Sequence, residues 1–247
     1  MNFKLILLDI DPALTRAWNQ QILFHKSIIK PQNVPKIFTG PLATVPTAGV
    51  AAIKFDCIVS PGNSFAQMDG GFDLVITKLF SRVSDIPAVL AHVKRAHYTR
   101  WKGYQPVGTS YLIDMNQFAA GNEFDCRFVA HTPTMRVPSV LDRADVVYDC
   151  MWSVLNEVQR HNNAAATAHD LDDSNKIRTV AVTGLGTGVG KLDPKQCATL
   201  MVLAYVHFLE SLDAGEQSLV GLDWSKEIAW EEKIRNYELT QTPHLNI

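Results

Sequence analysis

Two glycine-rich stretches carry residues that could bind an anion. The first follows the apolar run Phe55–Val59 and ends in Asp69-Gly70-Gly71, directly before the helix-like segment Phe72–Phe80. Glycines at a helix start leave backbone N–H groups unpaired, and the helix dipole favours a negative charge there. We expect a bound ligand to contact Ser60, Gly62, Gly70, Gly71 and Phe72.

The second stretch, GLGTGVG at residues 184–190, follows the apolar run Thr179–Thr183. Alternating glycines let a loop press its backbone amides against a ligand. The dinucleotide fingerprint would need glycine at Val189, and the Walker motif would need Ser or Thr at Leu192. We therefore expect a diphosphate held by backbone amides, without a metal or cofactor. The expected contacts are Gly184, Gly186, Thr187, Gly188, Val189 and Gly190.

Three polar residues near these loops are candidates for catalysis. Asn63 follows a strand end, where its amide could orient water, or could simply form the turn. Asp69 could act as a base or compensate the charge of a helix N-terminus. His131 could donate a proton to a leaving oxygen, or be a hydrogen-bonded histidine at a strand end.

Other charged residues have simpler explanations beside a functional one. Asp9 or Asp11 could touch a ribose or base, although Asp11-Pro12 is also a good helix start. Arg136 could pair with a phosphate or form a surface salt bridge. Phe65 and Phe72 could stack on a sugar or base, and Phe72 is more typical of a core position.

Strands and helices alternate along the chain. Expected strands are Lys4–Leu8, Ile37–Phe38, Phe55–Val59, Val107–Asp114, Phe124–Ala130 and Thr179–Thr183. Expected helices are a segment after Pro12, Phe72–Phe80, Ile86–Tyr98, Ala144–Gln159, Asp193–Leu212 and Trp224–Tyr237, the last packed by Trp224, Ile228 and Ile234. We expect His161–Asn175 to be an exposed insertion. The pattern predicts a largely parallel or mixed sheet covered by helices on both faces.

The segments IVSPGNSFAQMDGGFDLVI, VAHTPTMRVP and VTGLGTGVGKLDP, in this order, resemble the ligand-loop motifs of the macrodomain family. The resemblance spans roughly Phe55 to Leu209 and is nearest to a divergent branch that includes fungal ADP-ribose-1''-phosphate phosphatases. It implies one three-layer α/β/α domain over residues 1–247, with an N-terminal βα extension, a C-terminal helix and a central, largely parallel mixed sheet.

The resemblance also implies an ADP-ribose derivative as ligand. It implies removal of the terminal phosphate from ADP-ribose-1''-phosphate, with Asn63 positioning water and Asp69 or His131 handling the proton. Alternatives are a hydrolase that removes ADP-ribose from modified proteins, which needs room for a macromolecule beside Asn63, and a non-catalytic reader of ADP-ribose or of another nucleotide. The chain departs from the family at Pro41, where an aspartate commonly binds adenine, so the base specificity stays open.

Composition narrows the class of protein. The 247 residues are 47% hydrophobic with a formal net charge of −2, which argues against nucleic acid as a main partner. The sequence predicts no membrane-spanning segment, because its apolar runs are short, and its N-terminus does not resemble a signal peptide. We therefore expect a cytoplasmic or nuclear protein. The four cysteines lack zinc-site spacing and are expected to be free, buried thiols.

Overall fold

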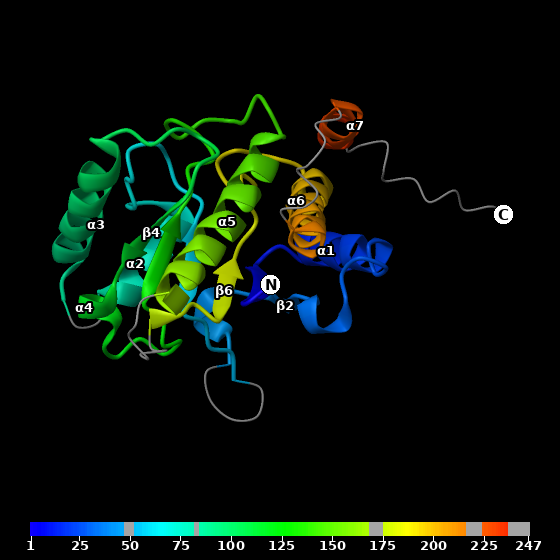
Figure 1. Cartoon of the computed structure of the whole chain (residues 1–247). Helices are drawn as coiled ribbons and strands as arrows, with labels where there is room; N and C mark the ends of the chain where they lie inside the picture. Colours follow the sequence, from blue (N-terminus) through cyan, green and yellow to red (C-terminus); the bar gives the residue numbers. More distant parts are fainter. Residues whose placement is uncertain (47–51, 82–83, 168–174, 216–223, 237–247) are drawn as a thin grey trace.

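A single mixed sheet organises the computed structural model, which describes residues 1–46, 52–81, 84–167, 175–215 and 224–236 (Figure 1). Within these residues, the strands lie in the order β2-β1-β6-β3-β5-β4. All neighbours are parallel except β4, which is antiparallel to β5. The strands are β1 (Lys4–Asp9), β2 (Lys36–Thr39), β3 (Cys57–Ser60), β4 (Tyr111–Asp114), β5 (Phe128–His131) and β6 (Thr179–Val182).

Helices connect the strands. Aspartate side chains cap the first turns of the helices that begin at Pro12, Ile86 and Pro194. The α-helices are α1 (Pro12–Phe24), α2 (Gly71–Phe80), α3 (Ile86–Trp101), α4 (Asn116–Ala119), α5 (Val146–Thr167), α6 (Pro194–Ala214) and α7 (Trp224–Arg235), with short 3-10 turns at Pro31–Asn33 and Leu42–Thr44.

The period-two alternation of the strands divides the core into two layers. Leu5 and Leu7 of β1 pack in one apolar cluster with buried residues of α1, α5 and α6. Ile6 and Leu8 pack in a second cluster with buried residues of α2 and α3. Figure 1 shows α2 and α3 together at one side of the molecule and α1 and α6 at the other. The predicted three-layer α/β/α fold with a largely parallel mixed sheet is confirmed.

The first strand is an interior strand of the sheet. Its Leu7 is in register with Ile37 of β2, and its Leu5 is in register with Val180 of β6. The N-terminal βα unit, which the sequence suggested as an extension, therefore supplies a strand on which the rest of the sheet depends.

Two expectations about helices were wrong. The segment after His161 continues α5 through Thr167, in keeping with its alanine run, while residues 168–174 lie outside the described residues. In α7, Trp224 and Ile228 are 76% and 53% exposed instead of packed. Ile234 packs against the core as predicted. Trp230 packs in place of the other two, since its ring lies 4.5 Å from His207 and 5.6 Å from Trp152, centroid to centroid.

Helix α6 is long and apolar enough to cross a membrane by length and composition, contrary to the expectation from the sequence. Every residue from Cys197 to Leu209 is buried inside the protein, so a core role accounts for this composition. The prediction for the cysteines is confirmed, because Cys57, Cys126, Cys150 and Cys197 are all buried and free.

Candidate functional site

Both glycine-rich loops leave the same edge of the sheet. β1, β3, β5 and β6 are mutually parallel, so their carboxyl ends meet at that edge. The first loop (residues 61–70) connects β3 to α2, and the second (residues 183–193) connects β6 to α6. In open α/β sheets, ligands bind in the crevice outside these strand ends. The two stretches singled out from the sequence are therefore brought together.

The Asn63 side chain organises the first loop. Its Oδ1 accepts hydrogen bonds from the backbone N–H groups of Phe65 (3.1 Å) and Gln67 (3.4 Å), and its Nδ2 donates to the Gln67 carbonyl (3.1 Å). The turn-forming role considered from the sequence is therefore present. An amide carries two N–H bonds, and these contacts use only one of them.

Ser60, expected to contact a ligand, lies fully buried at the end of β3. Its hydroxyl donates to Asp73 Oδ1 at 2.8 Å, which ties the strand to the first turn of α2. Burial raises the pKa of the Asp73 carboxyl to about 6, although the Ser60 hydrogen bond opposes the shift. Ser60 therefore stabilises the base of the first loop through this buried hydrogen bond and does not lie on the surface of the loop.

His131 is also buried, beneath Gly62. Its Nδ1 lies 2.7 Å from Gln105 Oε1, and because an amide oxygen only accepts, Nδ1 carries the proton. A Cβ added at Gly62 would come within 2.7 Å of His131 Nε2. Burial, the main cause, lowers the pKa of this histidine to about 3, so the imidazole is neutral near pH 7. His131 is thus a hydrogen-bonded histidine at the end of β5, which is the structural role that the sequence left open beside proton donation.

The start of α2 is open. Gly70 occupies the N-cap position without a side-chain capping hydrogen bond, and a Cβ added at Gly70 or Gly71 would meet nothing within 4 Å. Asp69, just before them, is exposed and accepts a hydrogen bond from Gln67 Nε2 at 3.0 Å. Phe72 packs partly against the core. The start of α2 therefore presents open backbone beside one exposed carboxylate.

Only part of the second loop faces solvent. Added Cβ atoms would come within 2.4 Å of Leu14 at Gly184, 2.5 Å of Leu141 at Gly186 and 2.4 Å of the Gly186 carbonyl oxygen at Gly190. Those three glycines serve close packing. Thr187 is partly exposed, Val189 is 55% exposed, and Gly188 is exposed with nothing within 4 Å of an added Cβ. The accessible tip is thus Thr187-Gly188-Val189.

Asp9 supports the second loop, a role that was not recognised from the sequence. Its carboxylate accepts hydrogen bonds from Thr183 Oγ1 (2.8 Å) and the Gly184 N–H (3.0 Å), and also from the Asp11 N–H (2.9 Å). Asp11 caps α1 through the Ala13 N–H. These contacts give both carboxylates a structural role. No local pattern marks Asp9, because its loop partners are distant in sequence.

A pocket of about 590 Å³ opens beside both loops, and Arg136 is the one candidate residue from the sequence among the described residues that line it. Its wall, residues 134–143, contacts the first loop through the Ser64 N–H, which donates to the Met135 carbonyl at 3.0 Å. The same wall contacts the second loop through the Leu141 N–H, which donates to the Gly190 carbonyl at 2.9 Å. Lining residues include Tyr104, Val107, Thr134, Arg136, Val140 and Arg143.

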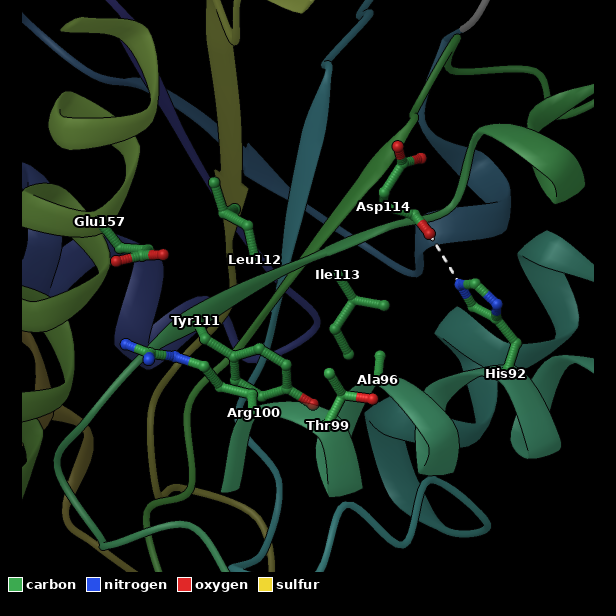
Figure 2. A pocket seen from close by; sticks show the side chains of 9 residues that line it. All are labelled: His92, Ala96, Thr99, Arg100, Tyr111, Leu112, Ile113, Asp114 and Glu157. Atoms are coloured by element: carbon green, nitrogen blue, oxygen red, sulfur yellow. Dashed lines mark hydrogen bonds between the residues drawn. The ribbon is translucent and has the colours of Figure 1, made fainter. Parts of the chain in front are cut away.

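A second hollow, of about 360 Å³, lies elsewhere, along the edge strand β4. Figure 2 shows it between β4 and α3, with Glu157 of α5 at its rim. His92 Nε2 closes one side by contacting the Asp114 carbonyl at 2.8 Å. The hollow contains none of the predicted site residues. Within the part of the chain that the structure describes, no group of three His, Cys, Asp or Glu side chains is suited to hold a metal ion.

Comparisons with known proteins found a sequence relative and several solved structures that this chain resembles. An uncharacterized protein of Aquifex aeolicus (strain VF5) is 26% identical over 183 residues, which cover 74% of this chain and 92% of the relative. The Oceanobacillus iheyensis macrodomain with MES bound is 15% identical, covering 80% of this chain and 90% of that one, with a TM-score of 0.49. The Mycobacterium tuberculosis DarG macrodomain is 16% identical, covering 65% and 88%, with a TM-score of 0.46.

The resemblance to the fungal phosphatase branch remains a prediction. The family itself is shown by a family model described as "Macro-like domain", which matches residues 44–212, from the turn after β2 to the end of α6. This match covers more than half of the chain and includes both glycine-rich loops. The protein belongs to the Macro-like domain family.

Proposed function

We propose that the chain binds ADP-ribose between its two glycine-rich loops and hydrolyses ADP-ribose-1''-phosphate to ADP-ribose and phosphate. Membership of the Macro-like domain family supports the ligand class. The open amides at the start of α2 and at the tip of the second loop support a diphosphate gripped by backbone donors.

One observation carries the proposal: the fold does not require glycine at Gly70 or Gly188. Neither residue has a positive φ, and a Cβ at either would meet nothing within 4 Å. Packing and backbone conformation explain the other glycines of the second loop, but not these two. The N-cap position of Gly70 also favours glycine, and close approach of a ligand to the backbone is a physical reason that applies to both residues.

The proposed reaction is direct attack by water on the terminal phosphorus. Asp69, the exposed carboxylate beside Gly70, takes a proton from the water, and the free N–H of Asn63 orients it. The P–O bond to the distal ribose breaks, phosphate leaves, and the ribose oxygen takes up the proton that Asp69 accepted from the water. His131 takes no part in this proton transfer in the proposed reaction, because its neutral imidazole is buried beneath Gly62. Its proposed role is to position the first loop.

Calorimetric titration with ADP-ribose tests the ligand, with AMP and a GDP-linked sugar as controls. We expect micromolar binding that Gly188→Glu abolishes and that Val34→Glu, an equally exposed change before β2, leaves intact. Release of phosphate from ADP-ribose-1''-phosphate then tests the reaction. Binding of ADP-ribose without phosphate release would refute the phosphatase activity and leave either a hydrolase of ADP-ribosylated proteins or a non-catalytic reader. Absence of binding would refute the whole proposal.

A second candidate function is the release of ADP-ribose from modified proteins. The observation that favours it is the pocket of about 590 Å³, whose wall residue Met135 forms a backbone bridge with Asn63. Phosphate release from the small substrate and ADP-ribose release from a modified peptide distinguish the two activities.

A further inference from the structure

The pocket beside the loops continues into exposed apolar surface. Phe65, on the first loop, is 43% exposed and contacts Tyr104 edge-to-face, with ring centroids 5.8 Å apart. Tyr104 is 42% exposed and lines the pocket together with Val140, which is 66% exposed. Contiguous exposed apolar groups next to a ligand loop are typical of a surface that binds a partner.

The size of the pocket favours an occupant larger than a phosphate group. At about 590 Å³, it lies within the range that accommodates drug-sized molecules. Val107, Leu141 and Val146 give it apolar walls, which a phosphate would not use.

The charges of the pocket argue against a polyanionic partner. Arg136 and Arg143 line it together with Asp142 and Asp149, so basic and acidic side chains balance. A nucleic-acid surface would be distinctly basic. A polypeptide carries both apolar groups and charges of either sign, so it complements a pocket with apolar walls and balanced charges.

Two polar side chains among the lining residues of the pocket lack a partner in the described structure. The Thr134 hydroxyl is buried, with the residue 1% exposed, and has no hydrogen-bond partner in the described structure. A hydroxyl can donate to a peptide carbonyl or accept from a peptide N–H. The exposed Arg136 side chain makes no ion pair or hydrogen bond with another described residue, whereas Arg143 is held by Asp145 at 2.7 Å.

We propose that this pocket, extended by the Phe65–Tyr104 pair, docks the polypeptide segment of a protein that carries ADP-ribose. The proposal rests on the second candidate function. The backbone contacts of Ser64 with Met135 and Arg136, at 3.0 and 3.2 Å, place the docked segment directly beside the ligand loops.

The test compares two ligands on the full chain: free ADP-ribose and a synthetic peptide mono-ADP-ribosylated on one glutamate side chain. The Asp69→Asn background slows turnover during the measurement. We expect the conjugate to bind about ten-fold more tightly than ADP-ribose, because the peptide adds contacts. Val140→Glu should remove this gain without changing the affinity for free ADP-ribose, and Arg136→Gln should reduce it. Val34→Glu is the matched control.

The outcomes separate the two proposals. If neither ligand binds, the proposed function fails and this inference fails with it. If ADP-ribose binds but the conjugate binds no better, or if Val140→Glu weakens both ligands equally, only the docking surface is refuted. If the conjugate binds more tightly than ADP-ribose and Val140→Glu removes only this gain in affinity, the result supports docking of the peptide. If ADP-ribose-1''-phosphate shows the same gain in affinity without a peptide, the docking proposal is overturned.

Discussion

The carboxylate of Asp9 accepts a hydrogen bond from the backbone N–H of Gly184 at 3.0 Å, across a sequence separation of 175 residues. The contact joins the end of β1 to the start of the second glycine-rich loop. Because β1 and β6 are neighbours in the sheet, the carboxylate lies just where this loop leaves its strand.

Replacing Asp9 should therefore destabilise the fold through the loop. Asp9→Ala removes an acceptor of three hydrogen bonds, two of them from the loop, and leaves the Gly184 N–H unpaired. We expect a loss of about 3 kcal/mol in the free energy of unfolding, measured by urea denaturation. The control Asp11→Ala, which removes only a helix cap, should cost about 1 kcal/mol. Equal losses in both variants would contradict this role for Asp9.

Glycines of the second loop should divide into two classes. Gly190→Ala places a Cβ 2.4 Å from the Gly186 carbonyl oxygen and should destabilise the protein by roughly 1–3 kcal/mol, as overpacking does. Gly188→Ala meets open space and should leave the unfolding free energy nearly unchanged. Thermal unfolding of both variants checks the difference. A large loss in Gly188→Ala would mean that the fold, and not a ligand, requires that glycine.

Stability should fall in acid partly because of His131. Its pKa is lowered from 6.5 to about 3, so the unfolded chain binds a proton more readily between these values. The stabilisation is present above pH 6.5 and is lost as the pH falls toward 3, on the order of 1.4 kcal/mol per pKa unit. His131→Met should flatten the pH dependence of the unfolding free energy between pH 4 and 6.5.

The carboxyl of Asp73 is a control, because its pKa shift makes the unfolding free energy change with pH in the opposite direction. Its pKa is raised from 3.8 to about 6, so its contribution is present below pH 3.8 and is lost as the pH rises through 6. Asp73→Asn should thus steepen the rise of stability with pH in the window where His131→Met flattens it. Parallel curves for wild type and both variants would show that these buried groups do not titrate on unfolding.

Turnover should depend on Asp69. The carboxylate is exposed beside Gly70, with Gln67 as its hydrogen-bond partner, so Asp69→Asn removes the proposed base with little effect on packing. We expect kcat for ADP-ribose-1''-phosphate to fall about 100-fold or more, while the Kd for ADP-ribose stays within about three-fold. Asp125→Asn, exposed before β5, serves as the control. An unchanged kcat in Asp69→Asn would exclude this base.

Helix α7 should depend on one aromatic anchor. Trp230 donates from Nε1 to the Tyr148 hydroxyl at 2.7 Å and packs on Trp152 and His207, whereas Trp224 is 76% exposed. Trp230→Ala should therefore accelerate hydrogen exchange throughout Trp224–Arg235. Trp224→Ala should leave the exchange rates unchanged. Similar acceleration in both variants would argue against Trp230 as the anchor.

Local patterns identified most of the fold. The alternation of short apolar runs with helical periodicity located the strands and most helices, because burial of a face imposes those periods along the chain. Asp11-Pro12 and Asp193-Pro194 marked two helix starts, because capping is a contact between residues that are neighbours in sequence. The spacing of Trp224 and Ile228 suggested packing that Trp230 supplies instead, since periodicity in a short helix does not fix which face is buried.

The sequence by itself determined the family, the two glycine-rich loops and the sheet edge that they share, because each is encoded by residues close together in the chain. Only the tertiary structure decided which loop residues reach that edge. It buried Ser60 and His131, assigned Asp9 to the second loop, left Gly70 and Gly188 open, and formed the pocket beside Asn63. These outcomes depend on packing between segments far apart in sequence, which no local pattern records.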